Sequence, residues 1–164
     1  DIGRGEDLKP MALNADAENI YVLDADNNSQ LVSFKKSDST MTVLSSGLAT
    51  TQAFSNLELA NTMLYWTEIT DEGSAWSFNL TDDTRSTIKE GMTNPRNILI
   101  EESNIFIAAG NGIFLIESDG TEIDVACSGI NVPHTIAVDD REVFIVDKPN
   151  TAAIRGQIVK WTEN

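Results

Sequence analysis

The residue types that most often perform chemistry in proteins are scarce in this chain. Its 164 residues include one histidine, His134, and one cysteine, Cys127. A single cysteine excludes an intrachain disulfide and a Cys-x-x-Cys metal or redox motif, and the apolar run IDVACSG around it favours a small core residue. No Gly-x-Ser-x-Gly motif, phosphate-binding loop or His-Glu-x-x-His motif is present. Catalysis by a Ser-His-Asp triad would depend on His134 alone, with no serine indicated.

Carboxylates are abundant, but their spacing does not favour catalysis or metal binding. The run DADNNS at residues 24–29 alternates oxygen ligands, whereas an EF-hand loop also needs Gly and Glu where Ser29 and Lys35 stand. Acid–base catalysis needs two carboxyl groups facing one pocket, and adjacent strand residues point to opposite faces. We therefore expect three adjacent pairs to end strands or form turns: Glu101-Glu102, Asp139-Asp140 and Asp82-Asp83. The sequence predicts no metal, no cofactor and no catalytic group.

The charge balance excludes two classes of partner. The chain has 11 basic and 26 acidic residues, a net charge of −15, and its only adjacent basic residues are Lys35 and Lys36. Proteins that bind a polyanion need clustered Lys and Arg, so binding to nucleic acid or to an anionic membrane surface is not expected. No run approaches 18 apolar residues, so no membrane span is predicted.

The elements that would position any site follow from an internal repeat. Four apolar segments carry an aromatic residue at positions 21, 65, 106 and 144, so the successive spacings are 44, 41 and 38 residues. A shorter extended run precedes each segment, a turn and a third run follow it, and the first three units have a fourth run. A repeat of about 40 residues with four strands is typical of a β-propeller blade. No long stretch keeps a helical apolar period.

The sequence therefore predicts an all-β fold, a β-propeller of four-stranded antiparallel blades with about four blades present. A single domain spans residues 1–164, with blades at about 8–48, 49–92, 93–130 and 131–164. The fourth unit has no outer strand after its third run. Two explanations compete: residues 1–7 supply a closing strand, or they are the remnant of a preceding blade. In the second case the chain is part of a larger ring, as a fragment or together with a second chain.

The segment Tyr65-Trp66-Thr67-Glu68 resembles the YWTD repeat of six-bladed propellers in lipoprotein-receptor ectodomains and bacterial extracytoplasmic proteins. Residues 21–24 and 144–147 look like degenerate copies, and residues 133–139 with 156–160 are similar to NHL and TolB-like blades. The resemblance covers nearly the whole chain and implies an extracellular or periplasmic binding platform. The acidic position of the motif is Glu68 in one unit and Ala109 in another, which implies uneven hydrogen bonding between blades.

If the first strand of each blade lines the central channel, the residues that begin these strands lie at one channel mouth: Met11, Phe54, Arg96 and His134. These four are our candidate ligand-binding residues. The segment Pro133-His134-Thr135-Ile136 resembles one in peptidyl-hydroxyglycine lyases that carries a metal-binding histidine. A tetrahedral metal site needs three or four converging ligands, and the other three positions hold Met, Phe and Arg. A polar contact from His134 and Arg96 to a ligand is the expected role.

These features favour a non-catalytic binding or scaffolding module that recognises a protein, peptide or small ligand through the propeller rim or channel mouth. The fold alone does not choose a function, and two alternatives stay open. One is a metal-dependent lyase or lactonase-type enzyme whose further ligands lie outside this chain. The other is a structural component of a surface assembly. The expected partner is a protein or peptide, with an oligomer or a second chain as the means of completing the ring.

Overall fold

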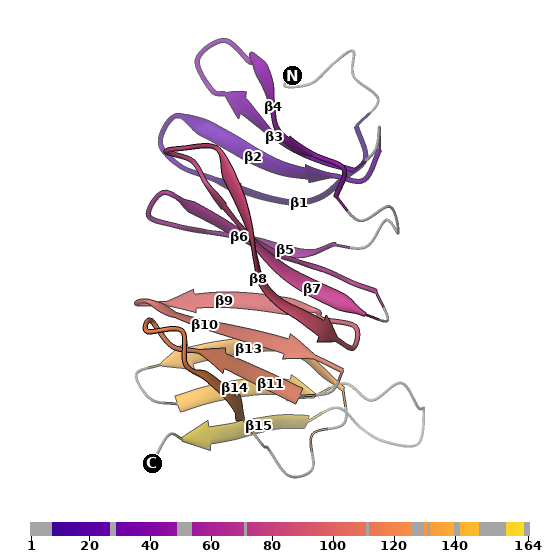
Figure 1. Cartoon of the computed structure of the whole chain (residues 1–164), viewed down its shortest axis with the longest axis vertical. Coiled ribbons are helices and arrows are strands. Elements are labelled where there is room, and N and C mark those ends of the chain that lie inside the picture. Colours follow the sequence, from indigo (N-terminus) through magenta and orange to yellow (C-terminus); the bar gives the residue numbers. More distant parts are fainter. Residues whose placement is uncertain are drawn as a thin grey trace.

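A computed structural model describes residues 8–26, 29–48, 54–70, 72–110, 112–125, 130, 132–139, 142–147 and 157–162. Within these ranges the chain forms fifteen strands in four antiparallel sheets and no helix, which confirms the all-β prediction (Figure 1). Each sheet keeps its strands in sequence order, as a propeller blade does. No helix of the described ranges is long and apolar enough to cross a membrane.

The four sheets follow one another along the chain. The first contains β1 (Pro10–Ala15), β2 (Asn19–Asp24), β3 (Gln30–Lys35) and β4 (Met41–Ser46). The second contains β5 (Phe54–Ala60), β6 (Met63–Glu68), β7 (Gly73–Asn79) and β8 (Thr84–Met92). The third contains β9 (Asn97–Glu101), β10 (Asn104–Ala109), β11 (Gly112–Ile116) and β12 (Glu122–Val125). The fourth has three strands in the described residues: β13 (Pro133–Asp139), β14 (Glu142–Asp147) and β15 (Gln157–Thr162).

Alternation along the strands decides which side chains meet each neighbouring sheet. The repeat aromatics Tyr21, Tyr65 and Phe106 pack toward the following sheet, whereas Leu57 and Trp66 pack toward the preceding one. Every boundary between two sheets therefore has its own apolar cluster. Full burial of one large apolar side chain contributes about 1.5–3 kcal/mol, so these boundaries are the main source of stability.

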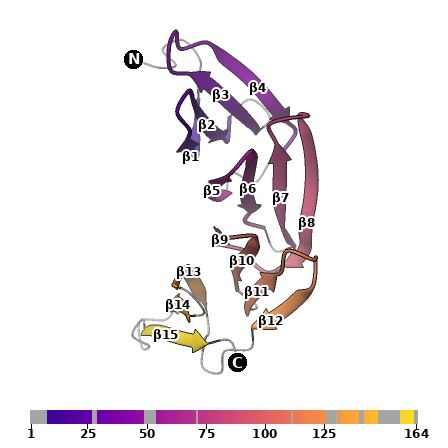
Figure 2. The ribbon, with the colours of Figure 1, turned by 90° about the vertical axis from the view of Figure 1, so that its left-hand side faces the viewer.

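The sheets form an open arc with their inner strands on the concave side. β1 contacts β5, β5 contacts β9, and β9 contacts β13, while β4, β8 and β12 lie on the convex side (Figure 2). The first and fourth sheets occupy the two ends of the arc and do not meet each other (Figure 2). The inner strands thus line the surface that would face the axis of a complete ring.

Two of the three carboxylate pairs end a strand or form a turn, as expected. Glu102 has a left-handed φ of 54° between β9 and β10, and Asp83 has a φ of 56° between β7 and β8. Asp82 Oδ1 accepts hydrogen bonds from the backbone and hydroxyl of Thr84, at 3.2 and 2.6 Å. Several predictions concern residues outside the described ranges: the closing strand at 1–7, the Asn27-Asn28 part of the DADNNS run, Cys127 and Asp140.

Candidate ligand-binding site at the inner strands

The inner strands of three sheets carry a β-bulge where they begin. The pairing register shifts at three places: between Pro10 and Ala12, between Phe54 and Leu57, and between Pro133 and Thr135. A bulge leaves a residue unpaired and changes the direction of its side chain, and bulges are frequent beside functional sites. Met11 is the extra residue in the first sheet, and His134 is the extra residue in the fourth.

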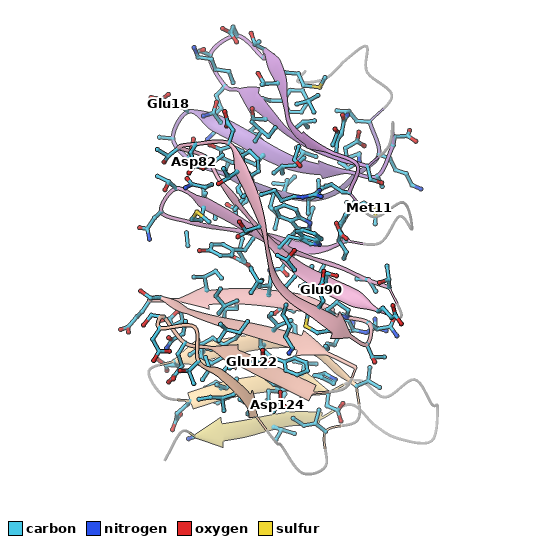
Figure 3. All side chains as sticks on the ribbon, in the orientation of Figure 1. Met11, Glu18, Asp82, Glu90, Glu122 and Asp124 are labelled. Atoms are coloured by element: carbon cyan, nitrogen blue, oxygen red, sulfur yellow. The ribbon has the colours of Figure 1, made fainter. Side chains whose placement is uncertain are left out.

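Both bulge residues are exposed. Met11 lies on the side of the arc where the inner strands begin, opposite to Glu18 in the turn after β1 (Figure 3). His134 occupies the corresponding place at the start of β13 and is also exposed. The chain therefore presents a thioether and an imidazole at equivalent points of its two end sheets.

Arg96 marks the same place in the third sheet, directly before β9. Its backbone N–H donates to the carbonyl of Ala108 at 2.7 Å, which fixes the start of the inner strand without a bulge. The residue is half-buried, and its Nε is buried without a hydrogen-bond partner. A guanidinium has five N–H donors and an obligatory positive charge, and because Nε is buried, a ligand oxygen would meet the terminal nitrogens of Arg96.

Phe54 departs from the expectation for the second sheet. Its side chain is 5% exposed and belongs to the apolar cluster between the first and second sheets. The bulge after Phe54 places Ser55 and Asn56 at the unpaired positions instead. Met11, Arg96 and His134 thus begin inner strands on one side of the arc. They make no hydrogen bonds to one another, and Phe54 is a core residue.

Asparagine side chains join the inner strands of neighbouring sheets, and none of them was among the candidates identified from the sequence. Asn14 Nδ2 donates to the carbonyl of Leu57 at 2.9 Å. Asn56 donates to the carbonyl of Ile98 at 2.6 Å and accepts from its N–H at 2.9 Å, and Asn97 Oδ1 accepts from the N–H of Ile136 at 3.2 Å. Each bond joins residues 43, 42 or 39 positions apart, which is about one repeat. The asparagines themselves recur at positions 14, 56 and 97, and this spacing is the sequence signal that could have revealed them.

The carboxylate at the fourth position of the YWTD-like segments accepts hydrogen bonds from residues of its own sheet. Asp24 is fully buried, and its Oδ1 accepts from the N–H of Lys9 at 2.6 Å and of Asp26 at 3.1 Å. Its Oδ2 accepts from Gln30 at 3.2 Å. Asp147 in the fourth sheet accepts from the N–H of Val132 at 2.6 Å. In both cases the carboxylate fixes the residue before the proline that begins its own inner strand, so these hydrogen bonds do not run between blades.

In the third sheet, where Ala109 replaces the carboxylate, backbone hydrogen bonds take over this role. Gly110 N–H donates to the carbonyl of Thr93, and Asn94 N–H donates to the carbonyl of Thr70 at 3.1 Å. The bond from Gly110 holds this linker to its own sheet, whereas the bond from Asn94 joins it to the second sheet, because Thr70 follows β6.

The inner strand of the second sheet carries a half-buried carboxylate, Glu58. Burial raises its pKa, and a hydrogen bond from Asn56 Nδ2 at 2.6 Å opposes that effect in part. In the first sheet the phenol of Tyr21 donates to Asp16 at 2.7 Å, which lowers the pKa of Asp16. Burial, followed by that carboxylate, raises the pKa of Tyr21 to about 12. Neither arrangement pairs an acid with a base at the start of the inner strands.

Among the described residues, no group of three His, Cys, Asp or Glu side chains could hold a metal ion. His134 lies at an exposed bulge, where it can donate or accept one hydrogen bond but gathers no such ligand set. The arrangement at the inner strands can provide ligand contacts through an imidazole, a guanidinium and a thioether.

The chain matches no protein-family model and no curated protein sequence. Its fold resembles many solved structures. A chain of the nidogen/laminin complex is 15% identical with a TM-score of 0.68, and the match covers 85% of this chain and 57% of that one. A putative TolB from Agrobacterium tumefaciens is 10% identical with a TM-score of 0.72, covering 99% and 64%. The designed protein Ika4 is 10% identical with a TM-score of 0.75, covering 98% and 95%.

These similarities identify the fold as that of a β-propeller. The chain spans 57% and 64% of the two natural proteins, but nearly the whole of the designed one. At 10–15% identity the likeness concerns the arrangement of strands, and a fold of this kind supports many functions.

Proposed function

We propose that this protein is a non-catalytic binding module that recognises a protein or peptide at the channel mouth formed by the starts of its inner strands. The observation that carries the proposal is the recurring bulge, which exposes Met11 and His134 at equivalent places. Arg96 stands at the same place in the third sheet, directly before β9. A concave surface lined by a few polar groups and an apolar contact is typical of ligand sites.

The chemistry of these side chains favours recognition over catalysis. A thioether adapts to apolar ligand groups, a guanidinium binds carboxylates with two parallel hydrogen bonds, and an imidazole can donate or accept. Arg96 is one of 11 basic residues in a chain with 26 acidic residues, so positively charged side chains are in the minority in this protein. The ligand we expect is a peptide segment with a carboxylate beside an apolar side chain.

One similar structure makes protein binding a reasonable role for the arc of sheets, because its chain comes from a complex of nidogen with laminin. TolB-like neighbours place related folds in bacteria as well. We propose an extracellular or periplasmic location on the same basis, since both the resemblance of the YWTD-like segments and the structural neighbours point to such proteins.

Selection from a displayed random-peptide library against the purified chain tests the proposal. The affinity of the selected peptide is then measured for the wild type and for Met11→Ser, Arg96→Ala and His134→Ala. We expect each mouth variant to weaken binding at least about tenfold, because truncation removes a direct contact. Ser86→Ala, on the exposed outer strand β8, is the matched control and should bind as the wild type does. Peptides that bind all mouth variants with unchanged affinity would contradict the proposal.

A further inference from the structure

One face of the fourth sheet is open across all three of its described strands. The sheet lies at one end of the arc, where no other described sheet covers its outward side (Figure 2). Val146 on this face is 37% exposed, and its cross-strand partner Ile158 is 75% exposed. Two cross-strand rows form the centre of this open face, and none of their side chains is buried: Thr135, Val146 and Ile158 in one row, and Ala137, Phe144 and Lys160 in the other.

The equivalent positions in the first three sheets belong to the core. Val146 lies two residues after the repeat aromatic Phe144. The residues at its place in the earlier sheets are all 0% exposed, because each meets the following sheet: Leu23, Thr67 and Ala108. The open face therefore has the pattern of a packed face without a cover among the described residues. Contiguous exposed apolar surface of this kind marks an interaction site.

The first sheet, at the other end of the arc, does not offer a matching open face. On its outward side Val22, Val32 and Phe34 are at most 7% exposed and form a closed apolar cluster. Leu13 and Val43 are exposed only at the two margins of this cluster. A contact between two copies that uses the open face must therefore join two like faces.

The open face is complementary to itself in size. Its inner strand β13 contributes the small side chains Thr135 and Ala137, and β15 contributes the long side chains Ile158 and Lys160. A twofold axis that runs parallel to the strands above β14 places β13 of one copy opposite β15 of the other. Small side chains then meet long ones on both sides of the axis. This alternation suits the close packing of two sheets about 10 Å apart.

The charges of the open face fit the same arrangement. Lys160 Nζ forms an ion pair with Glu142, and both side chains are partly exposed. The exposed Asp139 lies two positions after Ala137 on β13. With β13 opposite β15, Asp139 of one copy lies beside Lys160 of the other, and the contact occurs twice. An ammonium group has three donors, so it can serve both carboxylates.

We infer that two copies of this chain associate through the open face of the fourth sheet, related by this twofold axis. Because both copies use the same face, the contact is isologous and ends at a dimer. The net charge of −15 on each chain opposes association, but at about 0.15 M salt such repulsion is screened beyond about 8 Å. This inference stands independently of the proposed ligand.

Light scattering coupled to size-exclusion chromatography, over a range of protein concentrations, tests the inference on the whole chain. We expect a dimer whose dissociation constant increases at least about tenfold in Ile158→Asp, because the change buries a charge among apolar side chains. Leu13→Asp is the matched control: Leu13 is 66% exposed on the first sheet, so the dissociation constant should not change. Both side chains are exposed in a single copy, so circular dichroism should show an intact fold in both variants.

Charge reversal tests how the two copies are arranged. Asp139→Lys and Lys160→Glu should each weaken the dimer about tenfold, because each places like charges side by side across the axis. The double variant exchanges the two charges and should recover most of the lost affinity.

A wild-type chain that stays monomeric at all concentrations would overturn the inference. So would a dimer that Ile158→Asp leaves intact, a dimer that Leu13→Asp dissociates, or a double charge variant that binds no better than the single variants.

Discussion

At the scale of single residues, the side chains that look most reactive in the sequence have structural tasks. Asp24 and Asp147 are buried carboxylates, and both bind the backbone N–H of the residue before a proline. The asparagines that join neighbouring inner strands act in the same way between sheets. The polar residues left for a ligand are His134, at the bulge of the fourth sheet, and Arg96, directly before β9.

Replacement of Asp24 by Ala should lower the free energy of unfolding by about 1–3 kcal/mol, because it removes a buried acceptor from the N–H groups of Lys9 and Asp26 and from the side-chain amide of the buried Gln30. Urea denaturation followed by circular dichroism measures the change. Asp26→Ala, at an exposed neighbouring carboxylate, is the control and should be nearly neutral. Equal losses in the two variants would show that the buried hydrogen bonds of Asp24 do not matter.

Glu58 should make the stability depend on pH in a defined direction. Burial raises its pKa, so the folded state binds the proton more tightly than the unfolded state does. Ionisation therefore costs stability above the folded pKa, and protonation relieves this cost as the pH falls through that value. Glu58→Gln removes the ionisation and keeps an acceptor for Asn56, so its advantage over the wild type should grow from acidic to neutral pH. Urea titrations of both proteins across this range measure it; a constant difference would contradict the assignment.

At the scale of elements, the connection between the second and third sheets depends on close packing. A Cβ on Gly73, at the start of β7, would lie 2.2 Å from Pro95 Cδ and 2.7 Å from the carbonyl oxygen of Glu68. Pro95 belongs to the segment that leads to the inner strand β9 and Arg96. The glycine thus allows the linker to lie directly against the strand end.

Gly73→Ala should cost about 3 kcal/mol of unfolding free energy, since neither the proline ring nor the backbone can move away without disturbing the linker. Gly91→Ala is the matched control. Gly91 has a φ of +72°, and a Cβ added there would have no heavy atom within 4 Å, so only the left-handed backbone opposes the change, at about 1–2 kcal/mol. Thermal and urea denaturation of both variants compare them, and a larger loss in Gly91→Ala would refute the packing argument.

At the scale of the whole molecule, the repeat made the fold predictable from the sequence. Each sheet forms from strands that are consecutive in the chain, so the aromatic spacing from Tyr21 to Phe144 reports the number and order of the sheets. The position of Phe54 could not be predicted in the same way, because a bulge shifts the register and reverses the face on which a side chain lies.

The most direct test of a ligand site at the channel mouth follows the imidazole of His134, the only histidine in the chain, by NMR during titration with the selected peptide. Its ring C–H signals report the channel mouth without assignment of other residues. We expect these signals to shift in a saturable manner, with the same dissociation constant as the peptide binding measured independently, and Arg96→Ala should weaken both together. Ring signals that stay unchanged at saturating peptide would contradict a ligand site at the starts of the inner strands.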